Sequence, residues 1–73
     1  MDDYRIILDP EICSGKPTIR GSRIMVSNIL GMFAGGETLD GILDAYPQLN
    51  REDIGAALEY ASRAVNNERV IAR

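Results

Sequence analysis

The chain has 73 residues, of which 45% are hydrophobic and 26% charged, a composition typical of one small globular domain. No apolar run approaches the about 20 residues that span a bilayer, and no signal-peptide pattern opens the chain, so we expect a cytoplasmic protein without a membrane segment. Cys13 is the single cysteine and histidine is absent, which excludes a disulfide framework within the chain and argues against a metal site.

Charge is distributed unevenly along the chain. Residues 1–36 hold four acids and four bases, whereas residues 37–73 hold seven acids and four bases, which accounts for the net charge of −3. A strong stand-alone nucleic-acid binder usually carries a basic footprint, and the overall balance argues against one here.

A short β-prone run over residues 4–8 opens the chain and ends at the turn pair Asp9-Pro10. One strand is not stable by itself, so we expect it to pair with residues 18–20 or 23–25. Gly21-Ser22 between those two segments suits a tight hairpin, with the glycine supplying a positive φ at the first central position. The sequence therefore predicts a small N-terminal β element.

The first of three helical patterns places apolar residues three and four positions apart, which is the spacing of one helix face. Ser27 is a candidate N-cap near its start. Gly35-Gly36 is expected to end the helix, because glycine is favoured where the chain leaves a helix in a left-handed conformation. The expected buried stripe consists of Val26, Ile29, Leu30 and Phe33.

The second pattern begins after Thr38, whose hydroxyl can cap a helix. It stops before Pro47, because the residue that precedes a proline avoids the α conformation. The expected buried stripe consists of Leu39, Ile42, Leu43 and Tyr46.

The third pattern has the clearest start. Asn50 is a favourable N-cap, and Glu52 and Asp53 fall in the first turn, where the helix dipole favours acids. Leu49 before the cap can pack against Ile54. The expected buried stripe consists of Ile54, Ala57, Leu58, Ala61 and Val65, and its small alanines indicate that another helix crosses closely.

The predicted fold is mainly α, with a short N-terminal β element followed by three helices whose lengths and turns fit a helix-turn-helix arrangement. Within one domain, residues 1–25 hold the β element and a glycine-containing loop, residues 26–66 the three-helix unit, and residues 67–73 a C-terminal tail. A chain this short buries little apolar area, and the β run has an exposed edge, so we expect a homodimer formed through the β element.

The loop from Gly15 to Ile24 packs two glycines, one proline and three basic residues into ten positions. A nucleotide-binding phosphate loop is a poor interpretation, because Pro10 and Pro17 stand where backbone N–H donors are required. Its cations are candidate DNA phosphate contacts, and the alternative is that they pair with Asp9 and Glu11 or are simply solvated. The candidate DNA-binding cations of the loop are Lys16, Arg20 and Arg23.

Together with Arg5, these cations give at most about 4 phosphate contacts per chain, so specific DNA binding would need a dimer or a larger complex. Arg51 is a fourth DNA-binding candidate, because recognition helices usually meet bases near their N-terminal end. Acidic neighbours on the third helix would repel a phosphate backbone, however, and the small pair Gly55-Ala56 suits a protein partner that approaches closely. We favour the protein partner for the outward face, which consists of Arg51, Gly55, Ala56, Glu59, Ser62 and Arg63.

No constellation for hydrolysis or group transfer is visible, so the sequence predicts neither an enzyme nor a cofactor. Cys13 has no histidine to activate it and is interpreted as a half-buried turn residue. Asp9 and Glu11 are interpreted as a solvated acidic turn rather than an acid–base pair.

From Asp9 to about Ala61, the sequence resembles the bacterial family known as domain of unknown function 433. The pattern of that family runs from Asp-Pro through a Gly-Lys-Pro loop to a helix that ends in Tyr-Pro and a third helix with Ala-Ala-Leu. The chain matches it at Asp9, Pro10, Ile12, Cys13, Gly15, Lys16, Pro17, Ile19, Gly21, Arg23 and Ile24, and again at Gly36, Ile42, Leu43, Tyr46, Pro47, Leu49, Asp53, Ala56, Ala57 and Leu58.

Three positions depart from the family pattern: Ser14 replaces a usual glycine, Ser22 a usual threonine, and Met25 a frequent proline. Ser14 must therefore tolerate whatever backbone angle the glycine supplied.

The resemblance implies a homeodomain-like helix-turn-helix fold and a VapB-type antitoxin that binds and neutralises a small PIN-like ribonuclease toxin. It also implies repression of its own operon through DNA binding, as a dimer or as a complex. The alternative is a stand-alone helix-turn-helix transcriptional regulator without a toxin partner.

We expect the partner to contact the segment from Arg63 to Arg73, since large apolar residues near a chain end have little core to cover them. Its arginines would suit a nuclease site rich in carboxylates. The alternative is that the third helix continues and Ile71 folds onto the domain. The candidate partner-binding residues are Arg63, Arg69, Val70, Ile71 and Arg73.

Overall fold

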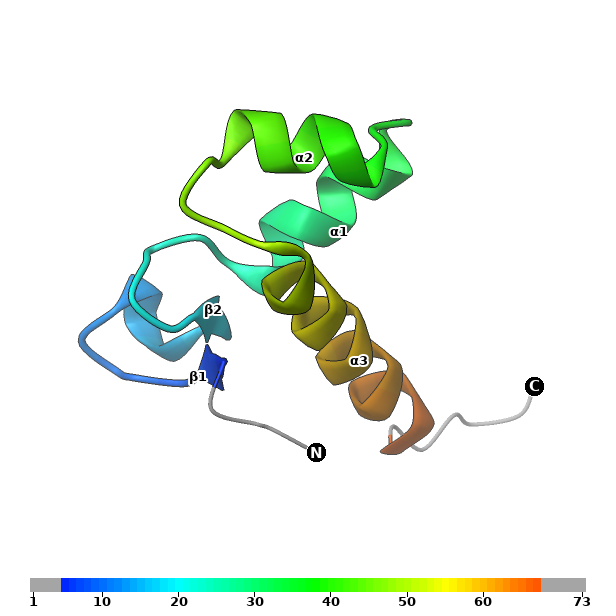
Figure 1. Cartoon of the computed structure of the whole chain (residues 1–73). Coiled ribbons are helices and arrows are strands. Elements are labelled where there is room, and N and C mark those ends of the chain that lie inside the picture. The colour runs from blue at the N-terminus through cyan, green and yellow to red at the C-terminus, as the bar shows by residue number, and fades with distance from the viewer. Residues whose placement is uncertain (1–4, 68–73) are drawn as a thin grey trace.

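The computed structural model describes residues 5–67, which form three helices and a small two-stranded antiparallel sheet (Figure 1). The predicted combination of an N-terminal β element and three helices is therefore confirmed. In chain order the elements are β1 (Ile6–Ile7), the 3₁₀ turn η1 (Cys13–Gly15), β2 (Thr18–Ile19), α1 (Val26–Ala34), α2 (Leu39–Ala45) and α3 (Arg51–Asn67).

The sheet pairs β1 with β2, with Ile6 opposite Ile19 and Ile7 opposite Thr18. Of the two partners expected for residues 4–8, the segment 18–20 is therefore the one that pairs with them, and a further bridge joins Thr18 to Met25. Gly21 has a positive φ of 80°, as predicted, but it occupies the third position of the turn closed by Ser22 N–H donating to Ile19 O at 3.0 Å. The glycine is therefore one position later in its turn than the hairpin pattern predicted.

The core lies where the sheet and the three helices meet. Ala57 is fully buried, and its small side chain lets α3 approach closely, as the alanine pattern predicted. β2, α1, α2 and α3 each contribute buried residues, and Ile6 of β1 is half-buried against them. The buried hydrophobic residues are Ile19, Ile24, Val26, Ile29, Ile42, Leu49, Ile54 and Ala57.

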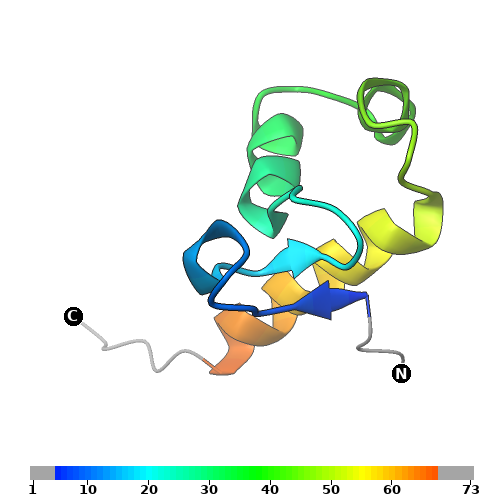
Figure 2. The ribbon, with the colours of Figure 1, turned by 90° about the vertical axis from the view of Figure 1, so that its left-hand side faces the viewer.

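Three residues expected in the buried stripes are instead exposed, namely Leu30, Leu58 and Val65. The exposed fraction is 41% for Leu58 and 63% for Val65. Figure 1 shows that the C-terminal half of α3 continues past α1 and α2. Figure 2 shows the sheet beside this half, and β1 contacts α3, but Leu58 and Val65 lie on the side of the helix that no described element covers.

Helix α1 begins without a side-chain cap. Its N-cap is Met25 and Ser27 lies inside the helix, so the predicted Ser27 cap is wrong. The helix ends as predicted, because Gly36 has a left-handed conformation with a φ of 100°. The backbone N–H groups of Gly36 and Glu37 reach back to the carbonyls of Phe33 and Met32, which is a Schellman ending.

Helices α2 and α3 begin as predicted. The Thr38 hydroxyl accepts a hydrogen bond from Gly41 N at 3.0 Å, and α2 ends at Ala45, two residues before Pro47. At α3, Asn50 Oδ1 accepts from Asp53 N at 2.9 Å, while Asp53 Oδ2 accepts from Asn50 N at 3.1 Å. This reciprocal pair is a capping box that satisfies two otherwise unpaired N–H groups.

Candidate functional site

The N-terminal lobe, defined here as residues 5–25, contains a left-handed turn. Cys13, Ser14 and Gly15 have φ values of 53°, 59° and 82°. Gly15 N donates to Ile12 O, and Lys16 N donates to Cys13 O, both at 3.1 Å. Since a left-handed conformation costs a non-glycine residue about 1–2 kcal/mol, Cys13 and Ser14 carry local strain. Ser14 therefore adopts a backbone conformation that glycine would adopt without this strain.

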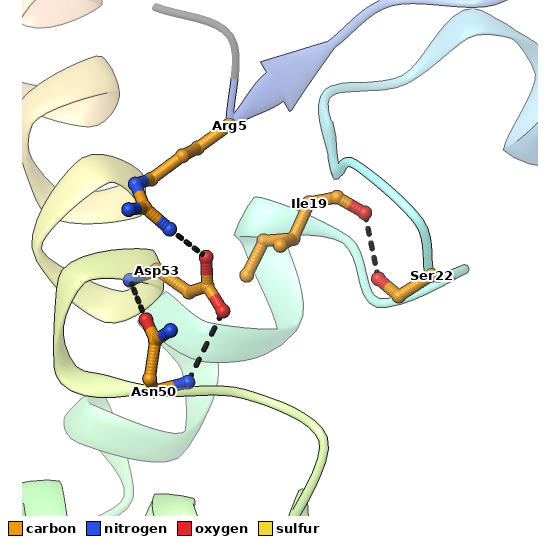
Figure 3. Close-up of polar contacts among 5 residues, drawn as sticks. All are labelled: Arg5, Ile19, Ser22, Asn50 and Asp53. Atoms are coloured by element: carbon orange, nitrogen blue, oxygen red, sulfur yellow. Dashed lines mark hydrogen bonds and ion pairs between the residues drawn. The ribbon is translucent and has the colours of Figure 1, made fainter. Parts of the chain in front are cut away.

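This turn is attached to the loop that follows β2. Cys13 Sγ lies 3.6 Å from the carbonyl of Arg23, to which it can donate a weak hydrogen bond. Ser22 Oγ donates to Ile19 O at 2.7 Å and accepts from Ile24 N at 3.0 Å (Figure 3 shows the first of these bonds). Cys13 is half-buried, as expected of a structural turn residue.

A shallow depression of about 240 Å³ lies between the two turns of the lobe. It is lined by Ile12, Gly21, Ser22 and Arg23.

The structure brings three predicted DNA-binding residues, Lys16, Arg20 and Arg23, into this lobe, and all three are exposed. Within residues 5–67, neither Lys16 nor Arg23 forms an ion pair, so the alternative of pairing with Asp9 or Glu11 does not hold for these two. Asp9 instead accepts a hydrogen bond from the backbone N–H of Glu11 at 2.9 Å. The lobe thus presents positive charge to solvent.

Arg5 has a structural contact that sequence reasoning missed. Its Nη1 donates to Asp53 Oδ1 at 2.8 Å, and the same Asp53 closes the capping box with Asn50 (Figure 3). The contact joins the N-terminal lobe to the start of α3 across 48 positions in sequence. Arg5 is therefore held within the protein, and no short-range pattern indicates such a contact.

Arg51, the fourth predicted DNA-binding residue, is held at a different place. It lies at the start of α3, and its Nη2 forms an ion pair of 3.2 Å with Asp40 of α2. Exposed acids surround this corner between α2 and α3. They are Glu37, Asp40, Asp44 and Glu52. The acids outnumber the single cation, so the corner is negatively charged.

Arg63 is the one predicted partner-binding residue within the described part of the chain. It is exposed on α3 and forms an ion pair of 3.1 Å with Glu59, one turn earlier. The other predicted partner-binding residues, Arg69, Val70, Ile71 and Arg73, lie outside residues 5–67.

None of the described helices is long and apolar enough to cross a membrane. No group of three or more histidine, cysteine or acidic side chains in this part of the chain could hold a metal ion.

Comparison with known proteins identifies relatives. The model of the family described as protein of unknown function (DUF433) matches residues 6–61. An uncharacterized protein, y4eO of Sinorhizobium fredii, is 36% identical over 52 residues, which cover 71% of this chain and 24% of the relative. The crystal structure of a DUF433 member from Anabaena variabilis superposes with a TM-score of 0.82 at 30% identity, covering 86% of this chain and 62% of the other.

The chain thus spans about a quarter of the length of the curated relative and less than two thirds of the crystallised one. The family match nevertheless covers most of the sequence, including the left-handed turn, the basic loop and the first eleven residues of α3. The chain therefore belongs to the DUF433 family.

Proposed function

We propose that this chain is a VapB-type antitoxin, which binds and neutralises a small PIN-like ribonuclease toxin. The observation that carries the proposal is the negative charge of the corner between α2 and α3. It favours a protein partner over direct DNA reading by α3, and the resemblance to antitoxin-like family members supplies the kind of partner.

A homeodomain-like helix-turn-helix protein would place the N-terminal end of its third helix against DNA. In this chain Glu52 is exposed there, and Asp40 and Asp44 flank it from α2. The single cation of the corner, Arg51, already pairs with Asp40. Phosphate contacts require cations in excess, so this surface repels a DNA backbone.

The partner-binding surface in this proposal is the C-terminal part of α3 and the segment after it. Arg63 is exposed, and the apolar residues Val70 and Ile71 follow it in the sequence. Arg69 and Arg73 follow in the sequence. Alternating cations and apolar residues suit a nuclease surface where clustered carboxylates bind a metal ion, because guanidinium groups form strong bidentate bonds with carboxylates.

Co-expression with the product of the adjacent reading frame tests the proposal. The frame should encode a small protein with clustered acidic residues, and that protein should co-purify with this chain and lose ribonuclease activity in the complex. Truncation after Val65 should leave a folded protein that no longer binds. Full affinity in the shortened chain would exclude the C-terminal segment as the binding element.

A second candidate function rests on the basic N-terminal lobe. Lys16, Arg20 and Arg23 are exposed on one lobe, away from the acidic corner. DNA contact through this lobe would serve operon repression in the antitoxin, or the activity of a stand-alone regulator. With so few phosphate contacts per chain, such binding is expected to need two copies of the lobe.

A further inference from the structure

An exposed stripe runs along α3 on the side turned away from the core. Its members are spaced alternately by four and three residues, which places them on one helix face at the period used by paired helices. Small and large side chains alternate along it. The stripe consists of Gly55, Leu58, Ser62 and Val65, all of which are exposed.

The chain's own packing gives no reason for the glycine in this stripe. A Cβ atom at Gly55 would meet nothing within 4 Å beyond its own stretch of helix. Glycine inside a helix is nevertheless less favourable than alanine. A close approach by another backbone or a large side chain accounts for a glycine here, and nothing in residues 5–67 makes that approach.

We propose that α3 pairs with α3 of a second copy in antiparallel orientation, about a two-fold axis level with residue 60. In this register Leu58 of one copy lies opposite Ser62 of the other, and Val65 lies opposite Gly55. Every large side chain then faces a small residue, as tight helix packing requires. Parallel pairing would instead place Leu58 against Leu58 and leave a gap between the two glycines.

Charge along the flank favours the same orientation. Glu59 and Arg63 form an ion pair within one helix and lie beside the stripe. Antiparallel pairing places this flank beside the same flank of the other copy and brings Glu59 of each copy towards Arg63 of the other, whereas parallel pairing places the two flanks on opposite sides of the pair. A two-fold contact of this kind repeats each favourable interaction twice.

The strand β1 offers a weaker route to a dimer. It contains only Ile6 and Ile7, so its edge is shorter than an ordinary added strand. The proposed pair uses a helix of 17 residues instead. This pairing is a property of the chain alone and does not depend on the toxin or on DNA.

Disulfide trapping tests the orientation. In full-length protein with Cys13→Ser, one preparation carries Leu58→Cys and a second, of different tag length, carries Ser62→Cys. Mixed and oxidised, they should give mainly the disulfide between the two preparations. Predominant cross-links within each preparation would show parallel pairing and overturn the proposal.

Sedimentation equilibrium with two matched pairs of variants tests the interface. Val65→Glu should weaken dimerisation at least about tenfold, whereas Ala64→Glu, an exposed neighbour off the stripe, should change it little. Gly55→Ala should weaken dimerisation while raising the Tm of the dilute monomer by about 3–6 °C. Gly31→Ala, at an equally open glycine of α1, should raise the Tm and leave dimerisation unchanged.

Circular dichroism confirms that each variant is folded before its association is measured. A wild-type chain that stays monomeric up to several hundred micromolar would overturn the proposal. A dimer that is weakened equally by the two variants of each matched pair would also overturn the proposal. A failed co-purification with the toxin would leave this result unchanged, so the two proposals fail independently.

Discussion

Replacing Ser14 with glycine should stabilise the protein. Ser14 has φ 59° and ψ 31° within the left-handed turn, is exposed, and makes no side-chain hydrogen bond to residues 5–67. Glycine removes a strain of about 1–2 kcal/mol from the folded state. It also raises the backbone entropy of the unfolded chain, which opposes this gain by up to about 1 kcal/mol. The free energy of unfolding should therefore rise by about 0.5–1 kcal/mol, equivalent to a Tm increase of about 2–8 °C.

Urea and thermal denaturation followed by circular dichroism measure this difference. Ser14→Ala is the matched control, because it removes the hydroxyl and keeps the Cβ atom that causes the strain. Gly15→Ala should lower the free energy of unfolding by about 1–2 kcal/mol, because a φ of 82° is unfavourable for alanine. The added Cβ atom itself has room, since its nearest neighbour is Pro10 Cα at 3.7 Å. Equal stabilisation by Ser14→Ala and Ser14→Gly would refute the backbone explanation, and so would a Ser14→Gly variant no more stable than the wild type.

Three further variants test other parts of the structure. Asp53→Ala should lower the free energy of unfolding by about 1–2 kcal/mol in urea denaturation, because it removes half of the capping box and the contact with Arg5. Glu52→Ala next to it should cost less than about 0.5 kcal/mol. Thr38→Ala should cost about 1 kcal/mol, whereas Ser27→Ala should be nearly neutral, and similar losses for both would contradict the observed caps. Replacing Arg20 and Arg23 together by glutamine should reduce the slope of log affinity for DNA against log salt by about 2 per chain, as measured by fluorescence anisotropy, and an unchanged slope would mean that neither contacts phosphate.

Features that depend on residues close in sequence could be predicted. Thr38 caps α2, Asn50 caps α3, and Gly36 ends α1, because each needs only a hydrogen bond or a backbone angle within about one helical turn. Gly21 also has the positive φ that the sequence predicted for it. Local chemistry was sufficient at these positions.

Features that depend on tertiary packing could not be predicted from the sequence. Helical periodicity assigned Leu58 and Val65 to the buried stripe, but it cannot tell where along a helix the covering elements stop. The contact of Arg5 with Asp53 joins residues far apart in sequence, so no motif reveals it. The sequence predicted that Arg51 could contact DNA, and only the position of α2 in the structure shows that Asp40 pairs with it.

Of the candidate site, the sequence located the basic loop and the three cations that the lobe exposes. It could not foresee the left-handed conformation at Cys13, since non-glycine residues rarely adopt it. The negative charge of the corner between α2 and α3 also required the structure, because its acids come from separate helices.

The most direct test of the proposed function is co-purification of the full-length chain with the product of its neighbouring reading frame, followed by a ribonuclease assay of the free and bound partner. The proposal predicts a stable complex in which the partner is inactive, and loss of that complex on truncation after Val65. Absence of a complex, together with operator binding by the chain alone, would contradict the proposal and favour a stand-alone DNA-binding regulator.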